Sequence, residues 1–183
     1  MATTTTHSKQ RARRKLREVL IGLTLMILIT GAALWFVLSK AGEWGVPGFT
    51  YTNEYGSTCE NGFVTNTCTE LTREELGARL EVPFPEQTEV LESTLEEGSN
   101  TTLRAKIRFP QADAGKFQAA LAEKYGHCRN DLPPPAMAEG MQKPCVMGND
   151  RFASESMSIR YVLVLGVREG EQDPVLGMDF LWR

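Results

Sequence analysis

Apolar and polar residues alternate along four segments of the chain, a pattern typical of half-buried β-strands. The clearest segment runs from Thr101 to Phe109. Its apolar positions are Leu103, Ala105, Ile107 and Phe109, and its basic positions are Arg104, Lys106 and Arg108. Residues 91–96, 157–167 and 176–182 alternate in the same way. The pattern therefore predicts two antiparallel hairpins, the first over 91–109 and the second over 157–182.

The first hairpin has a register that satisfies both of its faces. Gly98-Ser99-Asn100 provides the turn. If Leu95 pairs with Leu103, apolar side chains meet on one face and opposite charges meet on the other. This register also places Glu92 opposite Lys106 and Leu91 opposite Ile107.

Two segments with helical spacing accompany the hairpins. Thr72 and Glu75 form a capping box, and the proline-containing stretch 82–85 ends the helix that follows it. Residues 112–125 predict a second helix with Gly126 at its C-terminus. We therefore expect an α+β domain in which two helices cover one face of an antiparallel sheet of about four strands.

Residues 19–38 contain no charged side chain. As a helix they rise about 30 Å, which matches the hydrocarbon core of one bilayer. A cleaved signal peptide is the main alternative, but its apolar region is usually only about 7–15 residues long. The sequence therefore favours an uncleaved transmembrane helix over 19–39, with the hydroxyls of Thr24 and Thr30 bonded to carbonyls of the preceding turn.

Charge sets the expected orientation of this helix. Residues 1–18 carry six basic residues and one acidic residue, whereas the whole chain has a net charge of −3. Because basic flanks stay inside, we expect a cytoplasmic tail over 1–18, a tether over 40–58 and an extracytoplasmic α+β domain over 59–183. The membrane location accounts for the basic tail, so we expect a lipid bilayer as a partner and no nucleic acid.

All four cysteines follow the apolar segment, and an even number outside the cytoplasm indicates two disulfides. We favour the sequential pairs Cys59–Cys68 and Cys128–Cys145, since each closes a short loop. One signal opposes the first pair: a two-residue turn at Asn61-Gly62 would set Cys59 opposite Val64. Either this segment forms a looser loop or the cysteines pair otherwise.

The outer segment shows no recognisable catalytic or metal-binding pattern. Its one histidine, His127, has no triad, zinc-hydrolase or nucleophile-elbow motif around it, and the cysteines lack the C-x-x-C spacing. We therefore expect no enzyme activity, no metal and no cofactor.

Arg104, Lys106 and Arg108, here called the basic stripe, form the most organised polar set. They are the candidate binding residues, for an anionic envelope polymer or an acidic partner, although they could simply pair with Glu92 and nearby acids. Val162 and Val164 point away from the core face, so they mark either a partner surface or simply two valines of a central strand.

The chain resembles uncharacterised single-pass envelope proteins of actinobacteria. The features that carry this resemblance are the basic tail, the single anchor, the paired cysteines, the Val82-Pro83-x-Pro85 element before an acidic strand, and a partner strand ended by Pro110. This resemblance implies a cell-envelope location and no activity. We expect a non-enzymatic extracytoplasmic interaction or sensing module with a membrane or envelope protein as partner. The alternative is a structural accessory subunit of a cell-envelope or transport complex.

Overall fold

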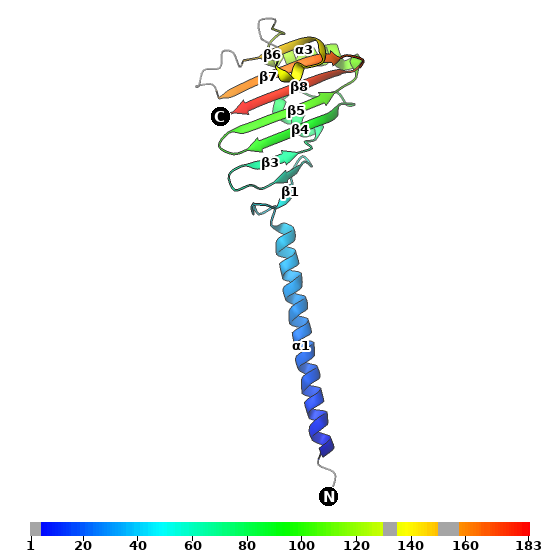
Figure 1. Cartoon of the computed structure of the whole chain (residues 1–183), viewed down its shortest axis with the longest axis vertical. Coiled ribbons are helices and arrows are strands. Elements are labelled where there is room, and N and C mark those ends of the chain that lie inside the picture. The colour runs from blue at the N-terminus through cyan, green and yellow to red at the C-terminus, as the bar shows by residue number, and fades with distance from the viewer. Residues whose placement is uncertain (1–4, 130–134, 150–157) are drawn as a thin grey trace. The chain divides into compact units, whose positions relative to one another are not determined.

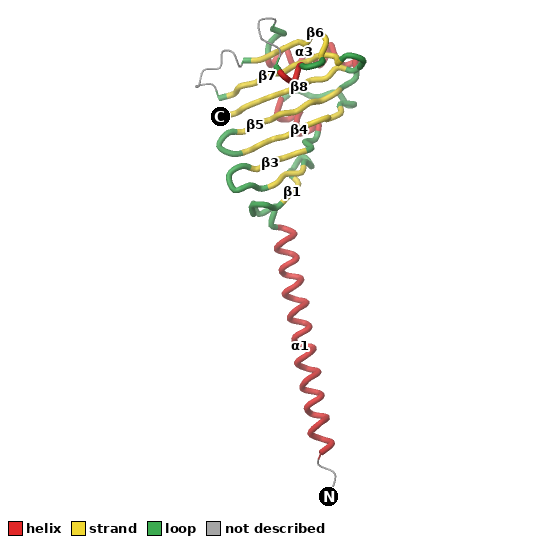
Figure 2. The backbone as a smooth tube through the Cα atoms, viewed as in Figure 1, coloured by secondary structure: helices red, strands yellow, loops and turns green. Residues whose placement is uncertain are grey.

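The computed structural model describes residues 5–129, 135–149 and 158–183, with side chains described from residue 15 onward. The chain divides into two compact units, Met1–Trp44 and Gly45–Arg183. The first consists mainly of helix α1, Thr5–Lys40. The second is an α+β domain, and Figures 1 and 2 show its strands running side by side.

Helix α1 is long and apolar enough over Lys15–Lys40 to cross a membrane, a property it shares with signal sequences. Its apolar side chains are exposed along this stretch, and near its end Phe36 packs edge-to-face with Trp44 while Lys40 pairs with Glu43. Thr24 donates its hydroxyl hydrogen to the Leu20 carbonyl at 2.9 Å, and Thr30 donates to the Met26 carbonyl. The expected back-bonding of both threonines is confirmed, so neither hydroxyl needs a partner outside the helix.

Eight strands of the described residues form one antiparallel sheet in the order β1-β2-β3-β4-β5-β8-β7-β6 (Figure 1). The strands are β1 Thr50–Thr52, β2 Thr58–Glu60, β3 Asn66–Thr69, β4 Glu89–Glu97, β5 Thr101–Arg108, β6 Met141–Gly148, β7 Ile159–Arg168 and β8 Pro174–Trp182. The helices of this unit are α2 Arg73–Leu80 and α3 Ala114–Tyr125, with short 3-10 turns at Gln111–Asp113 and Ala136–Ala138.

The expectation of about four strands is wrong, because it covers only the centre of the sheet. The four expected strands are β4, β5, β8 and β7, which lie next to one another. Strands β1, β2 and β3 extend one side of the sheet and β6 extends the other. Strand β1 falls within 40–58, the segment expected as a tether. The expected start of β7 at Met157 lies outside the described residues.

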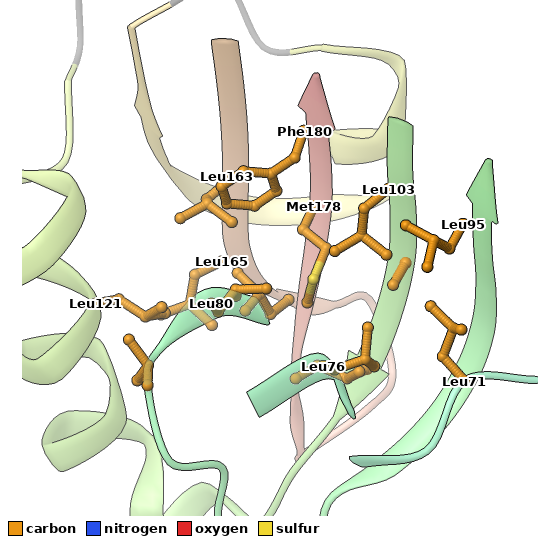
Figure 3. Packing of buried hydrophobic residues seen from close by; sticks show 14 of the residues in the cluster. Leu71, Leu76, Leu80, Leu95, Leu103, Leu121, Leu163, Leu165, Met178 and Phe180 are labelled. Atoms are coloured by element: carbon orange, nitrogen blue, oxygen red, sulfur yellow. The ribbon is translucent and has the colours of Figure 1, made fainter. Parts of the chain in front are cut away.

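Both helices pack on the same face of the sheet, as expected. Leu76 and Leu80 of α2 and Leu121 of α3 belong to one buried cluster with the inward side chains of the central strands (Figure 3). The strand residues labelled there are Leu95, Leu103, Leu163, Leu165, Met178 and Phe180. Each inward leucine is fully or almost fully buried, because alternation along every central strand directs it towards the helices.

A short segment of the chain covers part of the opposite face. Met137 and Ala138, in the turn before β6, pack with Val146 and Val164 in a second, smaller cluster. The contact beneath this segment is close, since a Cβ at Gly177 would come within 3.0 Å of the Met137 sulfur, so a larger residue there would require the Met137 side chain to shift. Val164 is therefore completely buried by the chain itself, so it is not available as a partner surface.

The expected register of the first hairpin holds over most of its length. Leu95 pairs with Leu103 and Glu92 pairs with Lys106, as expected. The third pair was expected between Leu91 and Ile107, but a bulge places Val90 opposite Ile107 instead. The bulge keeps an apolar residue on the core face after one residue is inserted into the strand.

Both expected disulfides are confirmed, Cys59–Cys68 and Cys128–Cys145. Cys59 and Cys68 lie directly opposite each other on β2 and β3, with their Cα atoms 3.9 Å apart. The Asn61-Gly62 pair does not form the two-residue hairpin that opposed this pairing. The strands are instead joined by a longer loop, residues 61–65.

Candidate functional site

The basic stripe lies along β5 on the sheet face opposite the two helices. Each stripe residue has an acidic partner on a neighbouring element. Arg104 lies 3.6 Å from Asp179 of β8, and Lys106 lies 3.3 Å from Glu92 of β4. Arg108 contacts two carboxylates, from Glu89 of β4 at 3.5 Å and from Glu171 at 3.3 Å.

These ion pairs change the electrostatic character expected of the stripe. Arg104 is 71% exposed and Glu92 is 74% exposed, so both signs of charge reach solvent. A surface with both signs interspersed attracts a long anionic polymer less than an unpaired basic row would. It fits better a protein partner that carries both signs in the complementary order.

A shallow hollow of about 240 Å³ lies at one end of the stripe. Its polar lining comes from Arg104, Asp179 and Arg160, and its apolar lining includes Val162 and Leu181. The three elements that provide these side chains, β5, β8 and β7, are adjacent in the sheet. The hollow therefore adds a small apolar contact to the charged face.

A second hollow, of about 520 Å³, lies where the segment 83–87 meets the start of α3. Phe84 packs edge-to-face against Phe117, with ring centroids 5.3 Å apart. Prolines and small apolar residues complete the walls, while Glu86, Asp113 and Lys116 are also in the lining. From the sequence, residues 82–85 were expected only to end a helix. The facing Phe117, spaced with Leu121 and Tyr125 on α3, was the signal that an aromatic contact forms there.

Glu75 is the one charged residue that the described part of the chain buries completely. Its carboxylate accepts hydrogen bonds from the Ser57 hydroxyl at 2.6 Å and from the Asn53 amide at 2.9 Å. Arg79 donates to it twice at 3.2 Å and also contacts Glu97 at 2.8 Å. The cluster ties α2 to the segment between β1 and β2.

Glu75 and Thr72 also form the expected helix cap, but in a modified form. The Thr72 hydroxyl accepts the Glu75 backbone N–H at 3.2 Å, as a capping box requires. The Glu75 carboxylate does not accept the Thr72 backbone N–H, as it would in a complete capping box. The Thr72 N–H donates instead to the Ser57 hydroxyl at 3.0 Å, and Ser57 donates to Glu75. The polar atoms of this cluster are thus engaged in holding the fold.

Two tyrosine hydroxyls on the core side are also engaged structurally. Tyr125 donates to the Leu80 carbonyl at 2.9 Å, and Tyr161 donates to the Tyr125 carbonyl at 3.1 Å. Burial raises the pKa of Tyr125 well above its ordinary value, with a smaller contribution from Glu81. Burial likewise raises the pKa of Tyr161. Both groups therefore act as neutral hydrogen-bond donors at physiological pH.

Within the described ranges, no three or more His, Cys, Asp or Glu residues come together in a way that could hold a metal ion. His127 is exposed just after α3, next to the Cys128–Cys145 disulfide. All four cysteines are bonded in pairs, so none is a free thiolate ligand.

No protein-family model matches the chain, and no curated protein or solved structure shows significant similarity to it. The resemblance to actinobacterial envelope proteins therefore stays a prediction. The ion-paired face of β4, β5 and β8 is the candidate binding surface of this chain.

Proposed function

We propose that the chain is a membrane-anchored extracytoplasmic module that binds a membrane or envelope protein and catalyses no reaction. Helix α1 serves in this proposal as an uncleaved anchor, with the basic tail in the cytoplasm and Gly45–Arg183 outside. The apolar stretch Lys15–Lys40 and the two disulfides support this location, since disulfides persist in oxidising compartments.

The observation that carries the binding proposal is the ion-paired face around the basic stripe. Its charges stand on the central strands β4, β5 and β8, whose other face packs into the main core. Rigid strands present side chains with little freedom to rearrange, which lowers the entropy cost of binding. Alternating signs on such a face favour one partner and one register over others.

The test is co-purification of the full chain, anchor included, from its own membranes. The variant replaces the stripe by glutamine, as Arg104→Gln, Lys106→Gln and Arg108→Gln together. The matched control replaces three cations on the helical side of the domain, Arg73→Gln, Lys116→Gln and Lys124→Gln. We expect the stripe variant to lose its partner and the control to keep it.

The unfolding free energy of each variant shows whether a lost partner reflects lost binding or lost folding. Exposed ion pairs contribute only about 0.2–1 kcal/mol each. Lys106 and Arg108 are partly buried, at 20% and 34% exposed, so the stripe variant should lose somewhat more stability than this range but remain folded. Binding by the unmodified chain should weaken as salt rises, because exposed charges are screened over about 8–10 Å. A stripe variant that folds and still retains its partner would refute the assignment of this face.

The same preparation separates the two forms that this function can take. A stoichiometric complex that survives purification favours a structural accessory subunit of a larger membrane assembly. A small ligand that raises the unfolding temperature of the chain favours a sensing module, since binding to the folded state alone stabilises it.

A further inference from the structure

The loop between β2 and β3 presents two apolar side chains to solvent. Phe63 is 93% exposed and Val64 is 82% exposed. Outside α1, the next most exposed large apolar residue of the described chain is Trp44, at 58%. Single apolar residues are common on protein surfaces, but a neighbouring pair of almost fully exposed side chains at a loop tip is a candidate contact.

The loop backbone is held in a fixed form beneath this tip. The Cys59–Cys68 disulfide closes its base, and Asn61 is almost completely buried. A Cβ at Gly62 would come within 2.1 Å of the Thr65 carbonyl oxygen. A Cβ at Gly98, in the neighbouring hairpin turn, would come within 3.2 Å of the Val64 carbonyl oxygen. Glycines thus allow close backbone packing that directs Phe63 and Val64 outwards.

The loop is also tied to the start of the domain. The Gly48 N–H donates to the Asn61 carbonyl at 2.7 Å, and the Asn61 N–H donates to the Phe49 carbonyl at 3.0 Å. Only residues 41–47 separate Gly48 from Lys40, the last residue of α1. Eight steps along an extended chain span at most about 28 Å, so an inserted α1 would keep the loop base within that distance of its end.

The chemistry of the loop suits the interface between lipid and water. Residues 61–69 carry no charge and include asparagine and threonine around the two apolar side chains, whereas the nearest carboxylates, of Glu60, Glu96 and Glu97, stand on the strands behind the loop. Aromatic rings favour the headgroup region of a bilayer, where polar backbone groups still reach water. A strongly acidic or basic tip would be held in solvent instead.

We propose that Phe63 and Val64 insert into the outer leaflet of the bilayer and give the domain a second attachment to the membrane. This proposal rests on the proposed function, because it requires α1 to be an anchor. The occupant is the lipid surface itself, with no particular headgroup required. A second attachment would restrict the motion of the domain about the residues that follow α1.

The test places a photoreactive benzoyl-phenylalanine at position 63 of the full chain in phosphatidylcholine nanodiscs. The matched control places it at Gln172, an exposed residue of the turn between β7 and β8. We expect lipid adducts at position 63 and few at position 172. A chain that is inserted in the disc but forms no more lipid adducts at 63 than at 172 would overturn the proposal.

A second measurement tests whether Phe63 drives the insertion. With the photoreactive residue at position 64, Phe63→Ser should reduce lipid adducts about tenfold, since burial of one large apolar side chain is worth at least that factor. The unfolding temperature should not change, because Phe63 is exposed. Unchanged adduct yield would refute Phe63 as the residue that drives insertion, and adducts to a second copy of the chain in place of lipid would refute the lipid contact itself.

Membrane retention separates failure of this proposal from failure of the anchor. If alkaline extraction releases the chain from the membrane, both the anchor and the loop contact are wrong. If the chain is retained and position 63 captures no lipid, only the loop contact is wrong.

Discussion

At the scale of single residues, Glu75 shows how a buried charge is accommodated in a small domain. An isolated carboxylate in the interior is costly, and here four hydrogen bonds from Ser57, Asn53 and Arg79 compensate for the loss of water. The sequence predicts Glu75 as a capping residue of α2, which is correct for its position. The contact between Glu75 and Ser57 could not be predicted, because Ser57 is positioned by the pairing of β2 with β1 and β3, which no local sequence pattern indicates.

We predict that Glu75→Ala destabilises the domain by about 2–4 kcal/mol, because it leaves Ser57, Asn53 and one side of Arg79 without their partner. Glu75→Gln keeps the shape and two of the acceptor sites, so its cost should be smaller. Glu74→Gln is the matched control in the same turn, where the side chain is exposed. Urea unfolding of the full chain in detergent measures all three, and equal stability of Glu75→Ala and the control would contradict the role assigned to the cluster.

Tyr125 leads to a prediction about alkaline pH. Burial raises its pKa above that of an unfolded tyrosine, which ionises near pH 10. The unfolded state therefore loses its proton first, so this contribution to stability is complete below about pH 10 and is lost as the pH rises towards the folded pKa. The free energy of unfolding should fall above pH 10 by up to about 1.4 kcal/mol per pH unit for this one group.

Tyr125→Phe tests the assignment. The variant should lose about 1 kcal/mol at pH 8, since the hydrogen bond to Leu80 disappears, and its stability should decline less steeply above pH 10. Urea unfolding at several pH values between 8 and 11 measures the slope. An identical slope in the variant and the unmodified chain would show that Tyr125 ionises freely in the folded state.

At the scale of elements, alternation predicts the central strands well and the edge strands poorly. Strands β4, β5, β7 and β8 have one face against a core, so their apolar residues recur at every second position. Strands β1 to β3 are only three or four residues long, and half of their residues are threonine. Strand β6 contains Pro144 and a bulge, which interrupt the alternation. The signal is lost where strands are short, polar or irregular.

The candidate site was likewise predictable only where its contacts are local. The residues of the basic stripe and the pairing of Lys106 with Glu92 could be predicted, because one register of the 91–109 hairpin matches apolar residues on one face and opposite charges on the other. The partners Asp179 and Glu171 could not, since they depend on the pairing of β5 with β8 and on the turn after β7. Contacts distant in sequence leave no periodic signal.

The two disulfides should differ in their response to reductant. Cys59 and Cys68 are each 1% exposed, whereas Cys128 is exposed at the surface. Thiol exchange requires access of the attacking thiolate, so a limiting amount of reductant should open Cys128–Cys145 first. Alkylation followed by peptide mapping gives the order. Simultaneous opening, or earlier opening of Cys59–Cys68, would show that the β2–β3 hairpin is not closed to solvent.

At the scale of the whole domain, the sheet has protected edges. Strand β1 has only three residues, and β6 carries a proline and a bulge, both of which discourage pairing with another chain. The Arg129 N–H also donates to the Val146 carbonyl on β6 at 2.7 Å. Edge-to-edge association is thus disfavoured, and a partner is better placed on the face of the sheet, where the basic stripe lies.

The location of the domain gives the last prediction. An impermeant thiol reagent, applied to intact cells after mild reduction, should label the cysteines without lysis, because we place all of them outside the membrane. The same cells should protect an epitope fused before residue 1 from added protease, and that epitope should stay on the same chain as the domain if α1 is not cleaved. The six basic residues of 1–18 provide the control, since replacing them by glutamine removes the excess of basic residues before α1, leaves only Lys40 just after it, and should yield a mixed orientation. Labelling only after lysis would reverse the topology, and an epitope separated from the domain would identify α1 as a signal sequence.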